Sequence, residues 1–254
     1  MTKTVVPAHS IDALMNKKLL RNLEIHSNAA AAISKVDIDS GIVASEDGTT
    51  VMKVSSPITV DIAASGVNGL DTGSEAVSTW YYLYIIYNPT TDTEAGLFSI
   101  SASSPTMPSG YTKKRLVSAI YNQSGGDFLT FKQENYEFYL LGRQSVIYGG
   151  TATAWTPLTM SSYVPSNICR TAKLNLVAFY GSTNVGTEWS QLAWKTGTAW
   201  TQIDWRRGVS GDYIVNSQTF DIPLDTKSPP TIWYRNSNSD SHFRVYVNGC
   251  RLQL

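Results

Sequence analysis

The sequence predicts an all-β protein: two antiparallel, jelly-roll-like β-sandwich domains in series, preceded by a short N-terminal helical segment. Composition is the first reason, because 29 Ser, 26 Thr, 14 Tyr and 18 Gly favour strands and turns over helices. Spacing is the second. Short apolar runs separated by Gly, Pro and Asn recur about every ten residues, which is typical of sandwiches and not of alternating βα units. At roughly 100–200 residues per domain, 254 residues accommodate two such domains.

Residues 1–35 form the predicted N-terminal segment. After an extended start, apolar side chains follow the spacing of an amphipathic helix that begins after Ser10 and ends between Glu24 and Asn28. A single amphipathic helix must cover its apolar face with the β-domains, with a copy of itself or with another protein. We expect the segment to serve oligomerisation or attachment to another protein. The apolar face consists of Ile11, Leu14, Met15, Leu19 and Leu23.

Residues 36–135 form the first predicted β-domain. Its clearest strand is Thr79–Tyr87, with the sequence TWYYLYIIY, which is apolar on both faces. Such a strand is buried on both sides, either inside a sandwich or against a neighbouring subunit. The side chains that would form a subunit interface are Trp80, Tyr82 and Tyr84.

Residues 136–254 form the second predicted β-domain, which contains a tryptophan-rich hairpin. A turn centred on Gly197 places these residues opposite one another: Trp194 and Trp200, Trp189 and Trp205, and Glu188 and Arg206. Aromatic rings edged by polar groups are typical of a surface on which a sugar ring stacks, but also of core or interface packing. The candidate platform for a glycan or a partner consists of Trp194, Trp200, Arg206 and Arg207.

Charge and cysteine content exclude several classes of protein. Lys+Arg and Asp+Glu both number 20, so the net charge is zero and nucleic-acid binding is not expected. No apolar run reaches the ~18 residues of a membrane span, and the N-terminus lacks the pattern of a signal peptide. We therefore expect folding in a cytoplasm without membrane insertion. Cys169 and Cys250 are expected to be buried free thiols. A charged fraction of only 16% indicates a surface partly covered by a partner.

No catalytic motif is visible, and we expect neither a catalytic residue nor a cofactor nor a metal. HExxH, P-loop, GxGxxG and GxSxG patterns are absent, and the chain has three histidines. The run Asp37-x-Asp39-x-Gly41 resembles the start of a calcium loop but lacks its twelve-residue spacing. A pair of glycosidase carboxylates stays an alternative, because their separation is spatial and not sequential.

Five short pieces occur in order within residues 61–131: Gly69–Gly73 (GLDTG), Thr79–Tyr81 (TWY), Asn88–Thr90 (NPT), Pro108–Tyr111 (PSGY) and Lys113–Arg115 (KKR). Together they resemble a segment that recurs in tail-fibre and other virion proteins of tailed bacteriophages. The resemblance covers a little over a quarter of the chain. It implies a structural virion component, usually homotrimeric, with β-sandwich domains in series. It also implies an N-terminus attached to the particle and a C-terminus that points outward.

The expected function is therefore that of a non-enzymatic virion protein, of the tail-fibre, head-fibre, collar or decoration type. The protein would assemble in the host cytoplasm as a homotrimer and contact other virion proteins through residues 1–35. Its C-terminal domain would face outward and bind host surface polysaccharide. The alternative is a carbohydrate-binding module that uses the tryptophan hairpin. A third hypothesis is a glycan depolymerase. Spikes with that activity usually have a long β-helix and clustered carboxylates, and the sequence shows neither.

Overall fold

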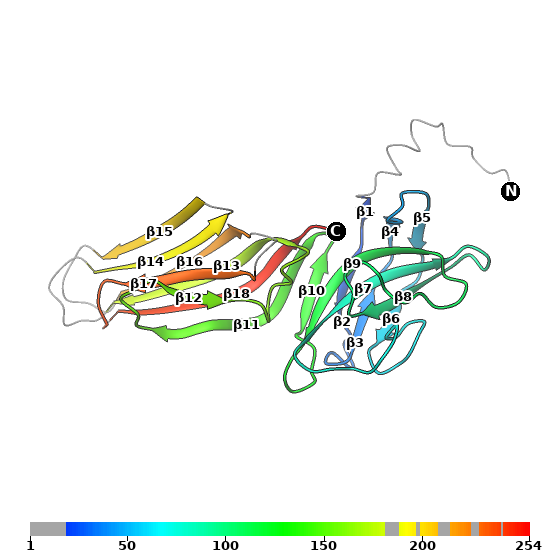
Figure 1. The fold of residues 1–254 in the computed structure, drawn as a ribbon, viewed down its shortest axis with the longest axis horizontal. Coiled ribbons are helices and arrows are strands. Elements are labelled where there is room, and N and C mark those ends of the chain that lie inside the picture. The colour runs from blue at the N-terminus through cyan, green and yellow to red at the C-terminus, as the bar shows by residue number, and fades with distance from the viewer. Residues whose placement is uncertain (1–18, 181–187, 197–198, 208–213, 225–228, 240) are drawn as a thin grey trace, which may run out of the picture. The chain divides into compact units, whose positions relative to one another are not determined.

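The computed structural model describes residues 19–180, 188–196, 199–207, 214–224, 229–239 and 241–254 (Figure 1). These residues form several antiparallel sheets, which confirms the predicted all-β class. They contain no helix, and hence none that is long and apolar enough to cross a membrane. The chain divides into two compact units: a first unit of residues 1–136 together with Leu254, and a second unit of residues 137–253.

The first unit holds three groups of hydrogen-bonded strands in its described part. Their orders are β1–β4–β5, β8–β7–β9 and β10–β2–β3–β6. The strands are β1 (Leu20–Arg21), β2 (Glu24–Ser27), β3 (Lys35–Ile38), β4 (Gly41–Ala44), β5 (Val51–Val54), β6 (Ile58–Asp61), β7 (Thr79–Asn88), β8 (Thr93–Ser99), β9 (Lys113–Asn122) and β10 (Phe131–Glu134).

Strand β7 supplies much of the first unit's core. All side chains of residues 81–86 are buried, on both faces of the strand, as its doubly apolar sequence predicts. Tyr81 packs against Phe98 at a centroid distance of 6.4 Å and against Phe128 at 6.3 Å. Strands β7 and β8 and the segment before β10 thus contribute aromatic rings to one core.

The residues predicted for a subunit interface lie inside the first unit or against it. Tyr84 is fully buried, and its hydroxyl donates a hydrogen bond to the Ser101 carbonyl at 2.8 Å. Tyr82 is 9% exposed, and the half-buried Trp80 packs on Tyr121 at 5.3 Å. The unit itself therefore covers Tyr82 and Tyr84, so the burial of β7 requires no partner chain.

The predicted N-terminal helix is not seen in the described residues. Residues 19–28, which include its expected end, instead contain β1 and β2. Asn22 between these strands has a left-handed φ of 53°, which interrupts any regular helix. Leu19 is half-buried beside β1, and Leu23 is only 1% exposed and belongs to the β-core, so neither lies on a helix face. The residues of the predicted helix that lie outside the described part are Ile11, Leu14 and Met15.

The second unit consists of two four-stranded antiparallel sheets in its described part, with the orders β11–β18–β13–β16 and β12–β17–β14–β15. The strands are β11 (Glu137–Gly150), β12 (Thr156–Thr159), β13 (Cys169–Tyr180), β14 (Glu188–Thr196), β15 (Ala199–Arg207), β16 (Ile214–Pro223), β17 (Thr231–Asn236) and β18 (His242–Leu252).

Strand β17 joins the two sheets of the second unit through its buried side chains. The Tyr234 ring stacks on Phe243 of β18, with centroids 5.9 Å apart and planes within 8°. Asn236 is 1% exposed, and its side-chain amide donates hydrogen bonds to the carbonyls of Gly150 (2.9 Å) and Ser241 (3.0 Å). Its side-chain oxygen accepts a hydrogen bond from the Ser190 hydroxyl at 2.8 Å. The side chains of β17 that alternate with Tyr234 and Asn236 therefore face away from this core.

Both cysteines lie in the core of the second unit. Cys169 and Cys250 are fully buried and form no disulfide, as the sequence predicts. Burial raises the pKa of the Cys250 thiol well above its usual value, so the thiol stays protonated at neutral pH.

Candidate functional site

The tryptophan-rich hairpin is formed by β14 and β15, but its register differs by one residue from the predicted register. Trp194 lies opposite Thr201 and not opposite Trp200, and Thr196 pairs with Ala199. Two residues therefore connect the strands, where the prediction placed a three-residue turn. The other predicted cross-strand pairs are out of register in the same way and are wrong.

This register places Trp194 and Trp200 on opposite faces of the sheet. Successive side chains of a strand alternate between its faces, so Trp194 shares the face of the buried Leu192. Trp200 lies on the other face and is 57% exposed. Arg206 and Arg207 continue β15, and their side chains lie outside the described part. The four predicted platform residues therefore do not form one surface.

A different surface replaces the predicted platform. It is the outward face of the β12–β17–β14–β15 sheet, opposite the face that carries Leu192, Ile232 and Tyr234. We call it the tryptophan face. Its described members include Trp155, which precedes β12, and Trp189, Gln191, Ala193, Lys195, Trp200, Gln202, Asp204, Trp233 and Arg235.

The tryptophan face encloses a groove of about 470 Å³. Trp200 and Trp233 meet edge to face, with ring centroids 4.7 Å apart and planes at 67°. Ala193 lies opposite Trp233 on β14, and its small side chain leaves room between the larger neighbours. The groove is lined by Trp155, Ala193, Trp200, Thr201, Gln202 and Trp233. It is therefore a largely aromatic groove with polar groups at its margin.

Two cations of the tryptophan face lie over aromatic rings. The Arg235 guanidinium carbon is 4.5 Å from the centroid of Trp155 and 5.2 Å from that of Trp189. The Lys195 ammonium is 5.7 Å from the centroid of Trp200. Cation–π contacts of this kind contribute about 0.5–1 kcal/mol at exposed sites and hold both partners in one orientation.

A chain of hydrogen-bonded polar side chains crosses three strands of the same face. Arg235 Nε donates to Gln191 Oε1 at 2.6 Å, and Gln191 Nε2 donates to Asp204 Oδ1 at 2.8 Å. Gln202 Nε2 approaches the same Asp204 oxygen at 3.4 Å. These contacts fix the direction of each amide and leave hydrogen-bonding groups beside the groove. The arrangement suits a flat polar ligand that also has an apolar side.

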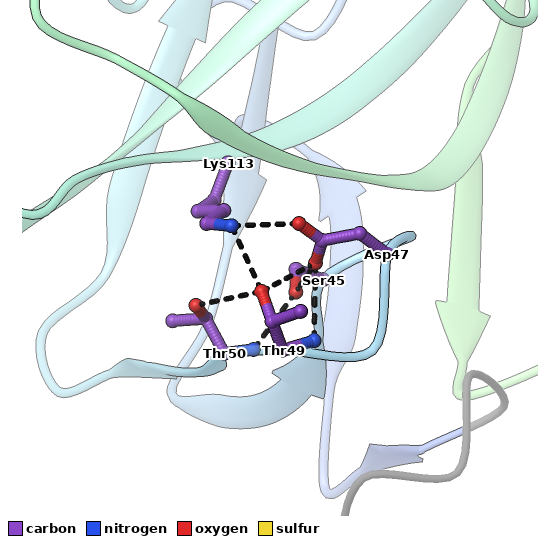
Figure 2. Close-up of polar contacts among 5 residues, drawn as sticks. All are labelled: Ser45, Asp47, Thr49, Thr50 and Lys113. Atoms are coloured by element: carbon purple, nitrogen blue, oxygen red, sulfur yellow. Dashed lines mark hydrogen bonds and ion pairs between the residues drawn. The ribbon is translucent and has the colours of Figure 1, made fainter.

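The first unit contains polar clusters whose contacts stabilise turns and strands. In Figure 2, Asp47 accepts hydrogen bonds from the Lys113 ammonium at 2.6 Å and from the hydroxyls of Ser45 (2.5 Å) and Thr49 (2.8 Å). The Lys113 ammonium, followed by the two hydroxyls, holds the pKa of Asp47 well below its usual range. The cluster closes the turn between β4 and β5 and ties it to the start of β9.

The residues of the calcium-like run serve different contacts. Asp37 accepts hydrogen bonds from the Asn28 amide and from the Thr59 hydroxyl, at 2.8 and 2.6 Å. Asp39 lies 3.4 Å from His26 Nε2. Together with Glu24, His26 and Asp39 form a half-buried group whose ligand atoms lie within 4.8 Å of one another. The Lys132 ammonium neutralises Glu24 at 3.0 Å. Hydrogen bonds to Asp37 and the Lys132–Glu24 ion pair therefore give these carboxylates structural partners.

Three members of the tryptophan face were not predicted as site residues from the sequence: Trp155, Trp233 and Arg235. They come from β17 and from the residue before β12, both far from the hairpin in sequence. The alternation of β17, in which Ile232, Tyr234 and Asn236 are buried, was the available signal for its outward side chains. No local pattern indicates that this strand pairs with β14.

Comparison with known proteins yields little. No family model matches the chain, and no curated protein sequence matches it. Among solved structures, a tryptic core variant of Bacillus thuringiensis Cry1Da is similar to the chain at 7% identity and a TM-score of 0.21. The alignment covers 98% of this chain and 56% of that chain. A TM-score of this size carries no argument about fold or function.

Proposed function

We propose that the protein binds carbohydrate through the tryptophan face of its second unit, as a non-enzymatic component of a bacteriophage virion. The observation that carries the proposal is the groove of about 470 Å³ between Trp155, Trp200 and Trp233, with Gln202 at its margin. A pyranose ring has an apolar C–H face and a rim of hydroxyls. Aromatic rings stack on the first, and amides and carboxylates hydrogen-bond the second.

The virion setting is supported by the resemblance of residues 61–131 to segments of phage tail-fibre and virion proteins. Strand order in the second unit supports a jelly-roll topology. Counted from β11, one sheet holds strands one, eight, three and six, and the other holds two, seven, four and five. Eight strands in two sheets of this kind recur in viral capsid and lectin domains, although fold by itself does not assign function.

The proposal further includes a homotrimer that assembles in the host cytoplasm and attaches to the virion through residues 1–35, with the second unit outward. Three grooves on one particle component would bind a repetitive host polysaccharide with higher avidity than any single groove. Light scattering after size-exclusion chromatography tests the trimer, which should have three times the 27.9 kDa of the chain. A second version that starts at Leu19 keeps every described strand and tests whether residues 1–18 are needed.

The groove itself is tested by Trp200→Ala and Trp233→Ala. Binding to host cells or to a polysaccharide array should fall at least ten-fold in each variant, because each removes one stacking ring. Tyr148→Ala is the matched control: Tyr148 is also an exposed aromatic residue of the second unit, 68% exposed, but belongs to β11 in the other sheet. Circular dichroism should show all three variants folded. Unchanged binding in both tryptophan variants would contradict the proposal.

A further inference from the structure

We infer that the ligand of the tryptophan face is an acidic polysaccharide whose carboxylate groups pair with Arg235. The inference rests on the proposed function and adds the chemical class of the ligand. Arg235 and Lys195 are cations of this face, and neither pairs with a carboxylate in the described part of the structure. The one described carboxylate of the face, Asp204, already accepts hydrogen bonds from two glutamine amides.

The guanidinium of Arg235 is oriented before any ligand binds. Trp155 and Trp189 contact it, at 4.5 and 5.2 Å from their ring centroids, and its Nε donates to Gln191 at 2.6 Å. A guanidinium has five N–H donors, and Nε uses one of them here. The four N–H groups on its Nη atoms form a planar fork, which matches the two oxygens of a carboxylate. Because the group is already oriented, little side-chain entropy is lost when an anion binds.

The two cations lie on either side of the aromatic groove. Arg235 pairs with Gln191, Trp233 pairs with Ala193, and Lys195 follows two residues further along the same face of β14. At about 3.4 Å per residue, the two cationic positions are roughly 14 Å apart along the strands, with Trp233 between them. A sugar chain that lies along β14 and stacks on Trp233 would meet a positive charge in both directions. Repeating acidic sugars fit this pattern better than neutral ones.

The test compares native and carboxyl-reduced forms of the same polysaccharides. Full-length protein is applied to an array of bacterial surface polysaccharides, each printed in both forms. We expect binding to acidic polysaccharides to fall at least ten-fold on carboxyl reduction. It should also weaken as salt is raised from 50 to 500 mM, because exposed ion pairs are screened. Equal binding to both forms would overturn the inference and leave the proposed function standing, whereas binding to neither form would contradict the proposed function.

Arg235→Gln gives the residue-level test. It should lose at least ten-fold in binding to the native acidic forms and change binding to the reduced forms little. Arg235→Lys keeps the charge without the fork and should recover part of the loss. The control is Arg143→Gln, because Arg143 also lies over an aromatic ring, Tyr246 at 5.5 Å, but on β11 in the other sheet. An equal loss for both polysaccharide forms in Arg235→Gln would assign Arg235 a purely structural role and overturn the inference.

Discussion

Replacing the buried Asn236 by Asp probes how β17 is held in the sandwich that supports the tryptophan face. The two side chains have the same shape, so the change creates no cavity. The aspartate keeps an acceptor for the Ser190 hydroxyl but loses both donors to the carbonyls of Gly150 and Ser241. Two lost hydrogen bonds cost about 2 kcal/mol, and a buried carboxylate facing two carbonyls raises the total to about 3–5 kcal/mol at pH 7.

Urea unfolding followed by tryptophan fluorescence measures this loss selectively, because six of the seven tryptophans belong to the second unit. With a slope of about 2 kcal/mol per molar urea, the midpoint should fall by about 2 M. Burial without a cation raises the pKa of the new carboxyl above its unfolded value near 3.9. The deficit should therefore be full above the folded-state pKa and shrink as the pH falls through it, since a protonated carboxyl donates one hydrogen bond again.

The control for this variant is Asn175→Asp, the same chemical change at a half-buried position of β13. Asn175 donates to the Ser217 hydroxyl at 3.2 Å in a contact exposed to solvent, where water replaces the lost bond. Its cost should stay below about 0.5 kcal/mol. A cost of Asn236→Asp as small as this at pH 7 would refute the reasoning. A large but pH-independent cost would refute its electrostatic part.

Three further predictions concern stability. A Cβ at Gly96 would overlap Val60 Cγ2, so Gly96→Ala should cost about 1–3 kcal/mol, and adding Val60→Ala should recover part of it in calorimetry; strictly additive losses would speak against this contact. Asp47→Asn should cost about 0.5–1 kcal/mol at pH 7, because the partly exposed Asp47–Lys113 pair is screened by water. Because the pKa of Asp47 is lowered in the folded state, the stabilisation that its carboxylate provides is complete above about pH 4 and is lost as the pH falls further. An equal stability difference between the parent and Asp47→Asn at pH 2 and pH 7 would count against this prediction. Both cysteine thiols are fully buried and should react with a thiol reagent only after unfolding, so rapid labelling of the native protein would contradict their placement.

The sequence was sufficient for the features that depend on local pattern. The apolar side chains on both faces of β7 predict the burial of residues 81–86, and the composition predicts the all-β class. The existence of the hairpin β14–β15 also follows from its aromatic residues and its central turn. These properties follow from side chains that are near one another in the chain.

The candidate site depends on contacts that local pattern does not encode. A shift of one residue in the hairpin register reverses the faces of one strand relative to the other. Trp194 and Trp200, which the prediction placed opposite each other, therefore lie on opposite faces of the sheet. The ring that Trp200 meets is Trp233, which β17 brings alongside β14 from a distant part of the chain. The helix prediction failed near Leu23 because an apolar spacing of three or four residues also arises from short strands that turn around a core.

The alternation of β17 separates the side chains of the proposed binding face from those of the core. Trp233 lines the groove and Arg235 lies on the same face, whereas Ile232, Tyr234 and Asn236 are buried in the core. Exchanging an outward residue changes the groove at little cost to packing, and the inward residues stay constrained. A protein built this way can acquire a new ligand preference through single substitutions without losing its fold.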